Sequence, residues 1–393
     1  MLILDFGAFS VLGGETKGNV MLKVITVVGT RPEIIRLACV IPLFDKYTKH
    51  ILVHTGQNYD YELNQIFFED LELRKPDYFL NVNTSSLGHV LGETLIKIED
   101  ILDQEKPDAM LILGDTNASI AAIMAKRKHI PIYHMEAGNR SFDANVPEEI
   151  NRKMIDHISD FNLVYTENSR RHLLAEGLSH RRVYVTGSPM YEVLNKYLPK
   201  IKQSNALKEL NLQRRKYFLV SVHREENVDY PDNLKRIGLV LNTLAEKYQY
   251  PIIVSTHPRT RKRLEMLEGF EFNSLIHFLK PFGFSDYNYL QMNALCVISD
   301  SGTISEESSI LKFPAITIRN SMERPEAIDA GTIILTGFDP EVVLDSINLV
   351  VEEGAHYAWI CPGYQVENTA MRALKLVMGT AKLHRQWSGL YNS

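Results

Sequence analysis

Small and hydroxylated residues follow a short apolar run late in the chain, in the segment Ser299-Asp-Ser-Gly-Thr-Ile-Ser-Glu-Glu307. The apolar run, Ala294–Ile298, is typical of a strand, and the residues after it are typical of the start of a helix. Backbone amides that converge at the start of a helix bind anions. The spacing therefore predicts an anion site around Ser301, Gly302 and Thr303.

A second turn of this kind, Gly29-Thr-Arg-Pro-Glu33, follows the apolar run Leu22–Val28. Its glycine permits a tight turn, its proline suits the first position of a helix, and Arg31 would direct a guanidinium toward an anion. Downstream, Arg324 adds another cation within Glu323-Arg-Pro-Glu326. Two turns that can hold phosphate suggest a diphosphate in a cleft, whereas a surface ion pair is the simpler interpretation of Arg31 alone.

Two carboxylates stand at the ends of apolar runs in the first half of the chain. Asp115 follows Ala109–Leu113, and Glu136 follows Ile130–Tyr133. An aspartate in this place is either the N-cap of a helix or a functional group, whereas a glutamate is a less ready cap. Glu136 is therefore the stronger candidate for a functional residue.

A helix is predicted to begin at Pro147, because proline suits its first position and the acidic residues that follow favour the helix dipole. Glu148, Arg152 and Asp156 succeed one another at intervals of four residues. This spacing is typical of a charge ladder on an exposed helix face. The motif alone supports that interpretation and a functional one about equally.

In the second half, two strand-end histidines, His223 and His257, follow successive apolar runs. A single histidine is usually structural. Together with Arg224 and Arg324, however, this pair suggests a positively charged wall of a cleft. Phe282 belongs to an aromatic cluster that could stack on a base, although aromatic residues at such spacing more often pack in a core or a loop.

The composition is that of an ordinary globular protein. At 393 residues the chain exceeds the usual size of one domain and predicts two. A charged content of 23% and a net charge of -5 give no general attraction to nucleic acids or acidic membranes, so an anion must be bound locally. The cysteines, Cys39, Cys296 and Cys361, form no CxxC pair, and we expect reduced thiols without structural zinc in a cytoplasmic protein.

From Leu22 onwards, apolar runs alternate with helical stretches in two series, which predicts two α/β units with doubly wound parallel sheets. The strands expected in the first unit are Leu22–Val28, His50–Thr55, Asp108–Leu113, Ile130–Met135, Asn162–Tyr165 and Arg182–Thr186. Those expected in the second unit are Lys216–Val222, Pro251–Thr256, Leu275–Leu279, Ala294–Ser299, Ala315–Ile318 and Thr332–Leu335.

We predict a first domain over residues 21–190 and a second over residues 212–362, with a hinge in Tyr191–Arg215, which lacks strand character. A last helix within residues 363–380 is expected to cross back to the first domain. Ligands of open parallel sheets bind beyond the carboxyl ends of the strands, where the motifs above fall. A dinucleotide site is excluded, because no G-x-G-x-x-G follows a strand.

Seven motifs in this order closely resemble the non-hydrolysing UDP-N-acetylglucosamine 2-epimerase family, over about residues 22–378. An ordered set is far more specific than any single motif. The motifs are Gly29-Thr-Arg-Pro-Glu33, Gly114-Asp-Thr116, His134-Met-Glu-Ala-Gly138, Pro147-Glu-Glu149 with Arg152, His223-Arg-Glu225, Asp300-Ser-Gly302 with Glu306-Glu307, and Glu323-Arg-Pro-Glu-Ala327.

The resemblance implies a GT-B-like fold, in which two Rossmann-type domains enclose a cleft for a UDP-sugar, and it implies a homodimer and no cofactor. In such enzymes UDP is eliminated anti to give a 2-acetamidoglucal, and it adds back after reprotonation of C2 on the other face. The resemblance makes Asp115, Glu136 and Glu148 candidate acid/base groups, and His223 a candidate for assisting departure of the diphosphate.

The C2–H bond is weakly acidic, so the reaction needs a positioned carboxylate and stabilisation of the departing diphosphate. Arg31, Arg324, His223 and the amides around Ser301 would supply that stabilisation. Glu307 suits a pair of ribose hydroxyls, because a carboxylate can accept two hydrogen bonds. The further candidate substrate contacts are Arg36, Arg152, Arg224, His257, Phe282, Gly302 and Thr303.

Two departures from the family pattern concern the sugar. Arg36 stands where many relatives have lysine, and the link between Glu136 and Glu148 is short. With Gly187-Ser-Pro-Met190 and Ser255-Thr-His-Pro-Arg259, these features look more like the branch that acts on UDP-linked 6-deoxy sugars for surface polysaccharides.

Three alternatives stay open at this stage. A GT-B glycosyltransferase would share the fold and the UDP site but would deliver the sugar to an acceptor. A hydrolysing epimerase would release free N-acetylmannosamine. A UDP-sugar sensor would bind its ligand without turnover. Separately, His257 and Gln57 could serve a second nucleotide site of the kind that activates some relatives.

Overall fold

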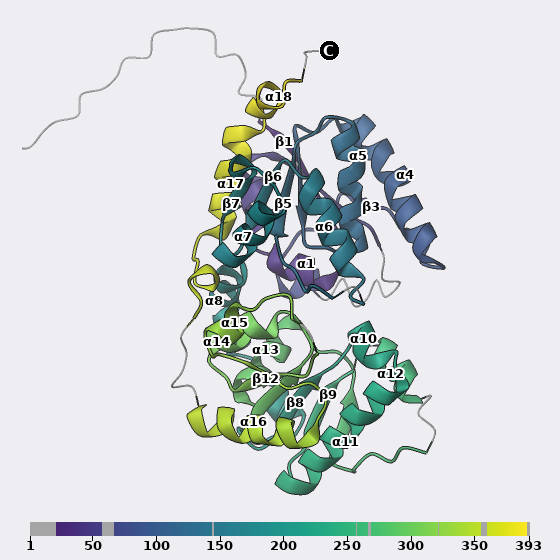
Figure 1. Ribbon diagram of the computed structural model, residues 1–393, viewed down its shortest axis with the longest axis vertical. Coiled ribbons are helices and arrows are strands. Elements are labelled where there is room, and N and C mark those ends of the chain that lie inside the picture. Colours follow the sequence, from purple (N-terminus) through teal and green to yellow (C-terminus); the bar gives the residue numbers. More distant parts are fainter. Residues whose placement is uncertain are drawn as a thin grey trace, which may run out of the picture.

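The computed structural model describes residues 21–56, 67–143, 145–256, 258–265, 269–320, 322–354 and 360–390. These residues form two α/β lobes, each around one sheet (Figure 1). We call the unit around strands β1 to β7 the first lobe and the unit around β8 to β13 the second lobe. Every strand pairing in both sheets is parallel.

The first sheet has the order β3-β2-β1-β4-β5-β6-β7. Because helices cover both faces, its strands are apolar on both sides, and all five residues of β4 are buried. The strands are β1 (Lys23–Val28), β2 (Lys49–His54), β3 (Tyr78–Phe79), β4 (Ala109–Leu113), β5 (Ile132–Ala137), β6 (Phe161–Val164) and β7 (Val183–Val185).

The second sheet repeats this pattern with the order β10-β9-β8-β11-β12-β13. Each sheet therefore reverses its strand order once, between β1 and β4 in the first lobe and between β8 and β11 in the second. The strands are β8 (Phe218–Ser221), β9 (Ile252–Ser255), β10 (Ile276–Leu279), β11 (Cys296–Ser299), β12 (Ala315–Thr317) and β13 (Ile334–Leu335).

Helices follow most strands, as the alternating pattern predicts. The first series comprises α1 (Arg31–Arg36), α2 (Val40–Tyr47), α4 (Leu87–Glu105), α5 (Ala122–Arg127), α6 (Glu148–Ile158), α7 (Glu167–Ala175), α8 (Met190–Ile201) and α9 (Ala206–Glu209). The second comprises α10 (Glu225–Val228), α11 (Pro231–Tyr248), α12 (Pro258–Glu265), α13 (Phe284–Asn293), α14 (Ile304–Leu311), α15 (Glu326–Asp329) and α16 (Pro340–Glu353), followed by α17 (Thr369–Thr380) and α18 (Leu383–Trp387). Short 3-10 helices occupy Asn117–Ala121, His180–Arg182 and Pro362–Tyr364.

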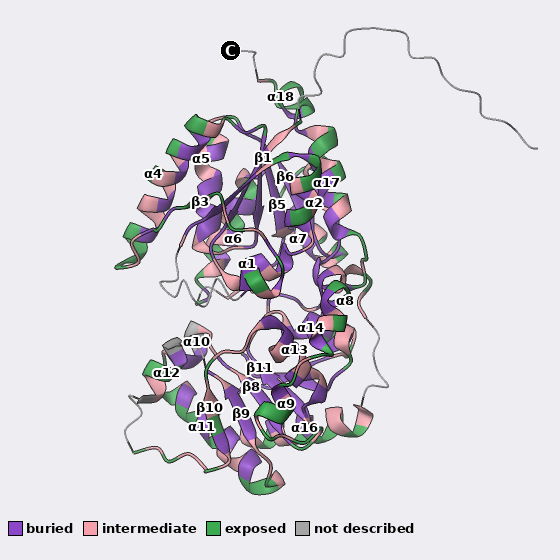
Figure 2. Cartoon of the chain, turned by 180° about the vertical axis from the view of Figure 1, so that it is seen from behind, coloured by how far each residue is buried: buried purple, intermediate pink, exposed green. Residues whose placement is uncertain are grey.

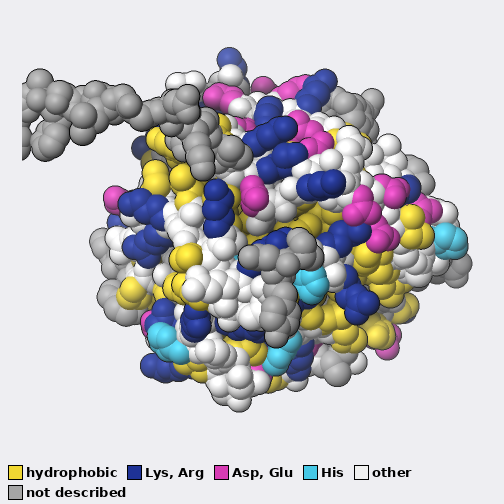
Figure 3. Space-filling view, turned by 90° about the horizontal axis from the view of Figure 1, so that it is seen from above, with side chains coloured by type: hydrophobic (Ala, Val, Ile, Leu, Met, Phe, Trp, Pro, Cys, Tyr) yellow, Lys and Arg dark blue, Asp and Glu magenta, His cyan; other side chains and the backbone are white. Residues whose placement is uncertain are grey.

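The alternation of side chains along each strand divides the first lobe's core between the two faces of its sheet. Val24 and Val28 of β1 pack with α2, α8 and α17, whereas Ile25 and Val27 pack with α4 and α5. The strands of both sheets are buried throughout most of their length (Figure 2). On the surface seen in Figure 3, basic and acidic side chains are intermixed, in keeping with the modest net charge.

One helix, α8, contacts both lobes, and a second, α17, returns the chain to the first lobe. α8 lies in the segment predicted to be a hinge and packs against α1 of the first lobe and against α13 and α14 of the second. α17 packs on α2, and its residues Ala373, Leu374 and Val377 are buried in the first lobe's core. In Figure 1, the yellow α17 accordingly lies along the first lobe, far from the second-lobe helix α16 that precedes it.

The two parallel sheets of the GT-B-like prediction are present, and all twelve expected strands overlap observed ones, with no end differing by more than two residues. The two-residue strand β3 was not predicted. The domain limits 21–190, 212–362 and 363–380 remain a prediction. None of the described helices has a stretch long and apolar enough to cross a membrane.

Candidate active site

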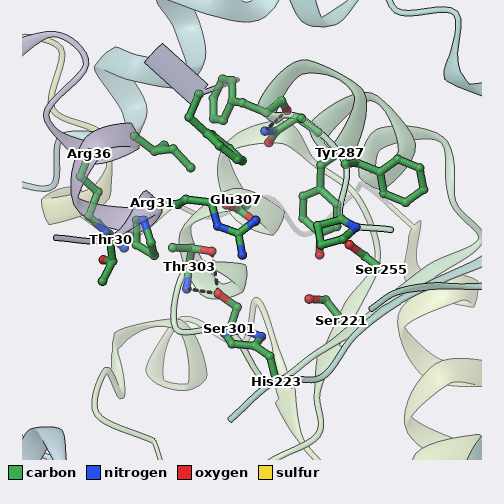
Figure 4. Close-up of a pocket in the computed structure, with 18 of the residues that line it drawn as sticks. Thr30, Arg31, Arg36, Ser221, His223, Ser255, Tyr287, Ser301, Thr303 and Glu307 are labelled. Carbon is green, nitrogen blue, oxygen red and sulfur yellow. Dashed lines mark hydrogen bonds between the residues drawn. The ribbon is translucent and has the colours of Figure 1, made fainter. Parts of the chain in front are cut away.

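The carboxyl ends of both sheets face a cavity of about 400 Å³ between the lobes. It lies beside the two points where strand order reverses, which is where α/β sheets bind ligands. Arg31 and Arg36 line it on the first-lobe side, and Ser221, Ser255 and Tyr287 line it on the second-lobe side (Figure 4). The cavity is therefore built from both lobes.

The predicted anion turn lies between β11 and α14, with Ser301 and Thr303 lining the cavity. The amide of Ser301 donates to the hydroxyl of Ser299 at 3.0 Å, and the amide of Thr303 donates to the hydroxyl of Ser301 at 3.3 Å. These acceptors are rotatable hydroxyls, which a stronger acceptor such as a phosphate can displace. Gly302 fits closely, since an added Cβ would lie 2.9 Å from an oxygen of Glu323.

The prediction that the turn after β1 offers its amides to a phosphate is wrong. The carboxylate of Glu33 accepts the amide hydrogens of Gly29 at 2.8 Å and Thr30 at 2.7 Å, and it also accepts the hydroxyl of Thr116 at 2.8 Å. Burial raises the pKa of Glu33 to about 7. Arg31 nevertheless lines the cavity, so this turn contributes a side chain and not its amides.

Glu136 is the second-to-last residue of β5 and lies at a β-bulge, with a φ of 66°. This left-handed conformation is costly for a residue other than glycine and is concentrated at functional sites. Its carboxylate bonds to Arg324 of the second lobe and lies 3.4 Å from Nε of Arg36. The hydroxyl of Tyr165 donates to it at 3.3 Å. Glu136 is thus an acid held between cations of both lobes.

Arg36 and Arg324 also share a second carboxylate, that of Glu306, at 2.5 Å from each. All three side chains are at most 5% exposed. The Nε atom of Arg324 is buried and has no hydrogen-bond acceptor among the residues that the structure describes. Arg324 therefore keeps one unused donor beside the cavity.

Asp115 is not a helix N-cap, because that position belongs to Thr116, whose hydroxyl accepts the amide hydrogen of Ala118. The carboxylate of Asp115 instead accepts Nε of Arg152 at 2.8 Å. Arg152 also donates to Glu149 at 2.9 Å. Asp115 therefore enters the site as the acceptor of a buried arginine.

The interpretation of α6 as a surface charge ladder is wrong, because Arg152 is 4% exposed and Asp156 is fully buried. Asp156 accepts hydrogen bonds from Arg140 at 2.7 Å and from the amide of Gly138. The helix begins at Glu148, one residue later than expected. Glu148 is half-buried and is not among the described residues that line the cavity.

His223 lines the cavity after β8, and its Nδ1 lies 3.1 Å from a carboxylate oxygen of Asp300. Asp300 is fully buried and also accepts the amide hydrogens of His223 and Arg224. Although burial acts to raise it, the pKa of Asp300 is held at about 2 by the charge of His223 and by these hydrogen bonds. The next residue, Arg224, donates to Glu323 at 2.7 Å.

The part of the cavity next to α13 has a mixed lining. Phe282 and Tyr287 are on this side, and Gln291 donates to Glu307 at 2.8 Å. Burial raises the pKa of Glu307 and that of Tyr287. An aromatic surface beside a carboxylate fits a base and its ribose, as the sequence suggests.

Seven predicted site residues line the cavity, namely Arg31, Arg36, His223, Phe282, Ser301, Thr303 and Glu307. Six others adjoin it through contacts or chain connection, namely Asp115, Glu136, Arg152, Arg224, Gly302 and Arg324. His257 and Gln57 lie outside the described residues. No motif contained Tyr165, and Glu33 and Asp300 stood in motifs without being predicted as site residues. Glu306 was part of a motif, but its identity alone did not distinguish it from Glu307.

A model of the family described as UDP-N-acetylglucosamine 2-epimerase matches residues 44–378 of this chain. A curated UDP-N-acetylglucosamine 2-epimerase from Methanococcus maripaludis is 39% identical over 347 residues, which cover 86% of this chain and 94% of that protein. The curated relatives also include a UDP-2,3-diacetamido-2,3-dideoxy-D-glucuronate 2-epimerase from Pseudomonas aeruginosa, 32% identical over 83% of this chain and 91% of its own length.

Solved structures agree. A UDP-N-acetylglucosamine 2-epimerase from Rickettsia bellii has a TM-score of 0.86 and 50% identity, covering 93% of this chain and 98% of its own. The Methanocaldococcus jannaschii enzyme, solved in complex with UDP-GlcNAc and UDP, has a TM-score of 0.85 and 35% identity over 91% of this chain and all of its own. A glycosyltransferase of kitacinnamycin, 9% identical with a TM-score of 0.58, shares the fold alone.

Proposed function

The chain belongs to the UDP-N-acetylglucosamine 2-epimerase family, and we propose that it is an isomerase that interconverts UDP-GlcNAc and UDP-ManNAc or a closely related pair of UDP-sugars. The observation that carries this proposal is the arrangement of charges between the lobes. Carboxylates at the carboxyl edge of the first sheet stand next to cations that border a cavity built from both lobes.

We propose that the second lobe supplies most of the groups that bind UDP. We propose that the base lies near Phe282, that Glu307 accepts the ribose hydroxyls, and that the turn Ser301–Thr303 receives the diphosphate. Arg31 and Arg324 add positive charge, and the unused Nε donor of Arg324 suits a phosphate oxygen. Such fixed positive charge stabilises the diphosphate as its bond to the sugar breaks.

The first lobe supplies the groups for proton transfer. We propose that Asp115, Glu136 and Glu148 act on C2 and its neighbouring atoms, and that His223 assists departure of the diphosphate. UDP leaves anti to the C2 proton, which gives a 2-acetamidoglucal, and it returns after a proton is delivered to the opposite face. Two faces require two positioned groups, and the strand ends of β4 and β5 hold Asp115 and Glu136 in different surroundings.

Incubation with UDP-GlcNAc in heavy water tests the reaction. Purified protein should produce UDP-ManNAc with deuterium at C2, because the intermediate is reprotonated from solvent. Epimer without label would reject elimination and re-addition, and absence of any epimer from each of the offered UDP-sugars would reject the proposed activity.

The identity of the sugar is a separate question within the same proposal. The relatives themselves act on different UDP-sugars, and the short Glu136 to Glu148 link with Arg36 favours a UDP-6-deoxy-HexNAc for surface polysaccharide synthesis. Parallel incubations with UDP-GlcNAc and a UDP-6-deoxy-HexNAc, resolved by chromatography, identify the preferred substrate from the ratio of kcat/KM values.

A glycosyltransferase is the second candidate, favoured by the shared fold of a solved glycosyltransferase. The carboxylates around Arg36 and Arg152 oppose it, because an acceptor-binding lobe has no need of them. Transfer of sugar to an added acceptor without deuterium at C2 would support this candidate. Release of free N-acetylmannosamine would instead indicate a hydrolysing epimerase.

We also propose a cytoplasmic homodimer. The three cysteines are unpaired in the structure, which suits a reducing compartment. Light scattering on the purified protein, which should give twice the mass of one 44.9 kDa chain, tests the dimer.

A further inference from the structure

Glu306, the third residue of α14, holds together groups from both lobes. It is fully buried and accepts hydrogen bonds from Arg36 of the first lobe and Arg324 of the second, each at 2.5 Å. It also accepts the hydroxyl hydrogen of Ser188, which lies between β7 and α8. Although burial acts to raise it, the two guanidiniums hold the pKa of Glu306 below its ordinary value. Glu306 is therefore an anion in this structure.

The same two arginines pair with Glu136. The four side chains form a closed ring in which charges alternate, from Arg36 to Glu136, to Arg324, to Glu306 and back to Arg36. The ring carries no net charge, and the aromatic ring of Tyr165 lies 5.5 Å from the guanidinium of Arg36 and 5.8 Å from that of Arg324. We call these four residues the charge ring.

The charge ring crosses between the lobes twice. Arg36 and Glu136 belong to the first lobe, whereas Arg324 and Glu306 belong to the second. Separation of the lobes would break the pairs Arg324–Glu136 and Arg36–Glu306 together. Loss of the Glu306 charge would leave two buried guanidiniums around one carboxylate, and uncompensated buried charge drives groups apart or toward water.

We propose that Glu306 is a positioning residue that, by holding Arg36 and Arg324 at once, makes the placement of the Glu136 carboxylate depend on contact between the lobes. It acts through the two arginines and not on the substrate, since it is absent from the described residues that line the cavity. The part of this inference that concerns turnover rests on the proposed function of Glu136.

The variant Glu306→Gln removes the charge and keeps the shape. We expect it to keep measurable but weaker binding of UDP, because Arg36 and Arg324 each lose one carboxylate partner, so kcat is compared per UDP-binding site. We expect kcat per UDP-binding site to fall by 10-fold or more, since a misplaced acid/base group loses much of the roughly 10² to 10⁴-fold that such groups contribute. Small-angle scattering without ligand should show a larger radius of gyration than that of wild type.

Asp160→Asn is the matched control. Asp160 is a 4% exposed carboxylate within the first lobe that pairs with Lys126 and accepts the amide hydrogen of Ile132 at 3.0 Å. The variant Asp160→Asn should lower the melting temperature while leaving kcat and the radius of gyration at wild-type values. Glu306→Asp keeps the charge but is one methylene shorter, so it should give an intermediate kcat, and it carries the test if Glu306→Gln does not fold.

Wild-type kcat per UDP-binding site in Glu306→Gln, or in a folded Glu306→Asp if the former aggregates, would overturn the proposal. So would a fall in melting temperature with kcat and radius of gyration unchanged, because that is the behaviour of a merely structural carboxylate. If the wild-type protein itself epimerises nothing, the proposed function fails, while the scattering comparison still tests whether Glu306 joins the lobes.

Discussion

Glu136 is held more tightly than a surface carboxylate, by a bulged backbone and by two arginines. If it and Asp115 exchange protons with the substrate, replacing either by its amide removes that chemistry and keeps the shape. We predict that Glu136→Gln and Asp115→Asn each lower kcat by about 10²-fold or more. Steady-state assays with UDP-GlcNAc measure this effect. UDP affinity, measured by calorimetry, should change little, and wild-type turnover in both variants would remove these residues from the mechanism.

Asp300 fixes His223 through both its ring and its backbone, accepting the amide hydrogen at 3.0 Å and facing Nδ1 at 3.1 Å. An asparagine keeps one acceptor but removes the negative charge that faces the His223 ring. We predict that Asp300→Asn lowers kcat about tenfold or more, which corresponds to about 1.4 kcal/mol of transition-state stabilisation. Steady-state assays with UDP-GlcNAc measure this effect, and wild-type kcat in Asp300→Asn would argue against a role for this pairing.

At the scale of elements, α1 shows how one residue joins two strand ends. Glu33 caps its own helix and reaches Thr116 at the end of β4, so the turns after β1 and β4 share one carboxyl group. Burial raises the pKa of Glu33 from 4.5 to about 7. Between these values the unfolded chain loses a proton that the folded protein keeps, so the free energy of unfolding falls as pH rises.

We therefore predict that wild type loses roughly 3 kcal/mol of stability between pH 4.5 and pH 8 that Glu33→Gln does not lose, at about 1.36 kcal/mol for each pH unit. Urea unfolding of both proteins at the two pH values measures the difference. The half-exposed Glu99, replaced by glutamine, should retain the wild-type dependence on pH. Parallel behaviour of wild type and Glu33→Gln would show that Glu33 titrates as an ordinary carboxyl group.

Strands were predictable from the sequence where a run of apolar residues was long enough to mark them. Twelve apolar runs become parallel strands because burial on both faces selects continuous hydrophobic segments. Strand β3 has only two residues, and Tyr78 and Phe79 are not fully buried, so no run marks it. The N-cap is Thr116 and not Asp115, for which the sequence left an N-cap and a functional carboxylate as alternatives, because local chemistry alone does not decide between neighbouring capping residues.

The site was predictable as a set of residue types at strand ends, because doubly wound sheets bring those ends to one crevice. The contacts that these residues make with one another were not predictable. Nothing in the spacing says that Arg36 meets Glu306, which is 270 residues away, or that Glu33 takes the amides of its own turn. Such pairings depend on how the lobes are placed and on whether an internal carboxylate or a ligand accepts hydrogen bonds from the same backbone amides.

At the scale of the whole molecule, the chain returns to its first lobe after completing the second. Leu374 of α17 is 2% exposed within the first lobe's core, whereas Met378 of the same helix is 49% exposed. If α17 belongs energetically to the first lobe, Leu374→Ala should destabilise that lobe by roughly 2–5 kcal/mol, the usual cost of a cavity in a core. Met378→Ala should cost less than about 0.5 kcal/mol.

Hydrogen exchange shows which lobe loses stability in Leu374→Ala. In Leu374→Ala, the amides of β1 and β4 should lose protection, because their side chains share a core with α17, while those of β8 and β11 should lose less. Equal loss in both sheets would mean that the two lobes unfold as one cooperative unit. The predicted limits of 21–190 with 363–380, and of 212–362, would then describe the path of the chain and not two units of stability.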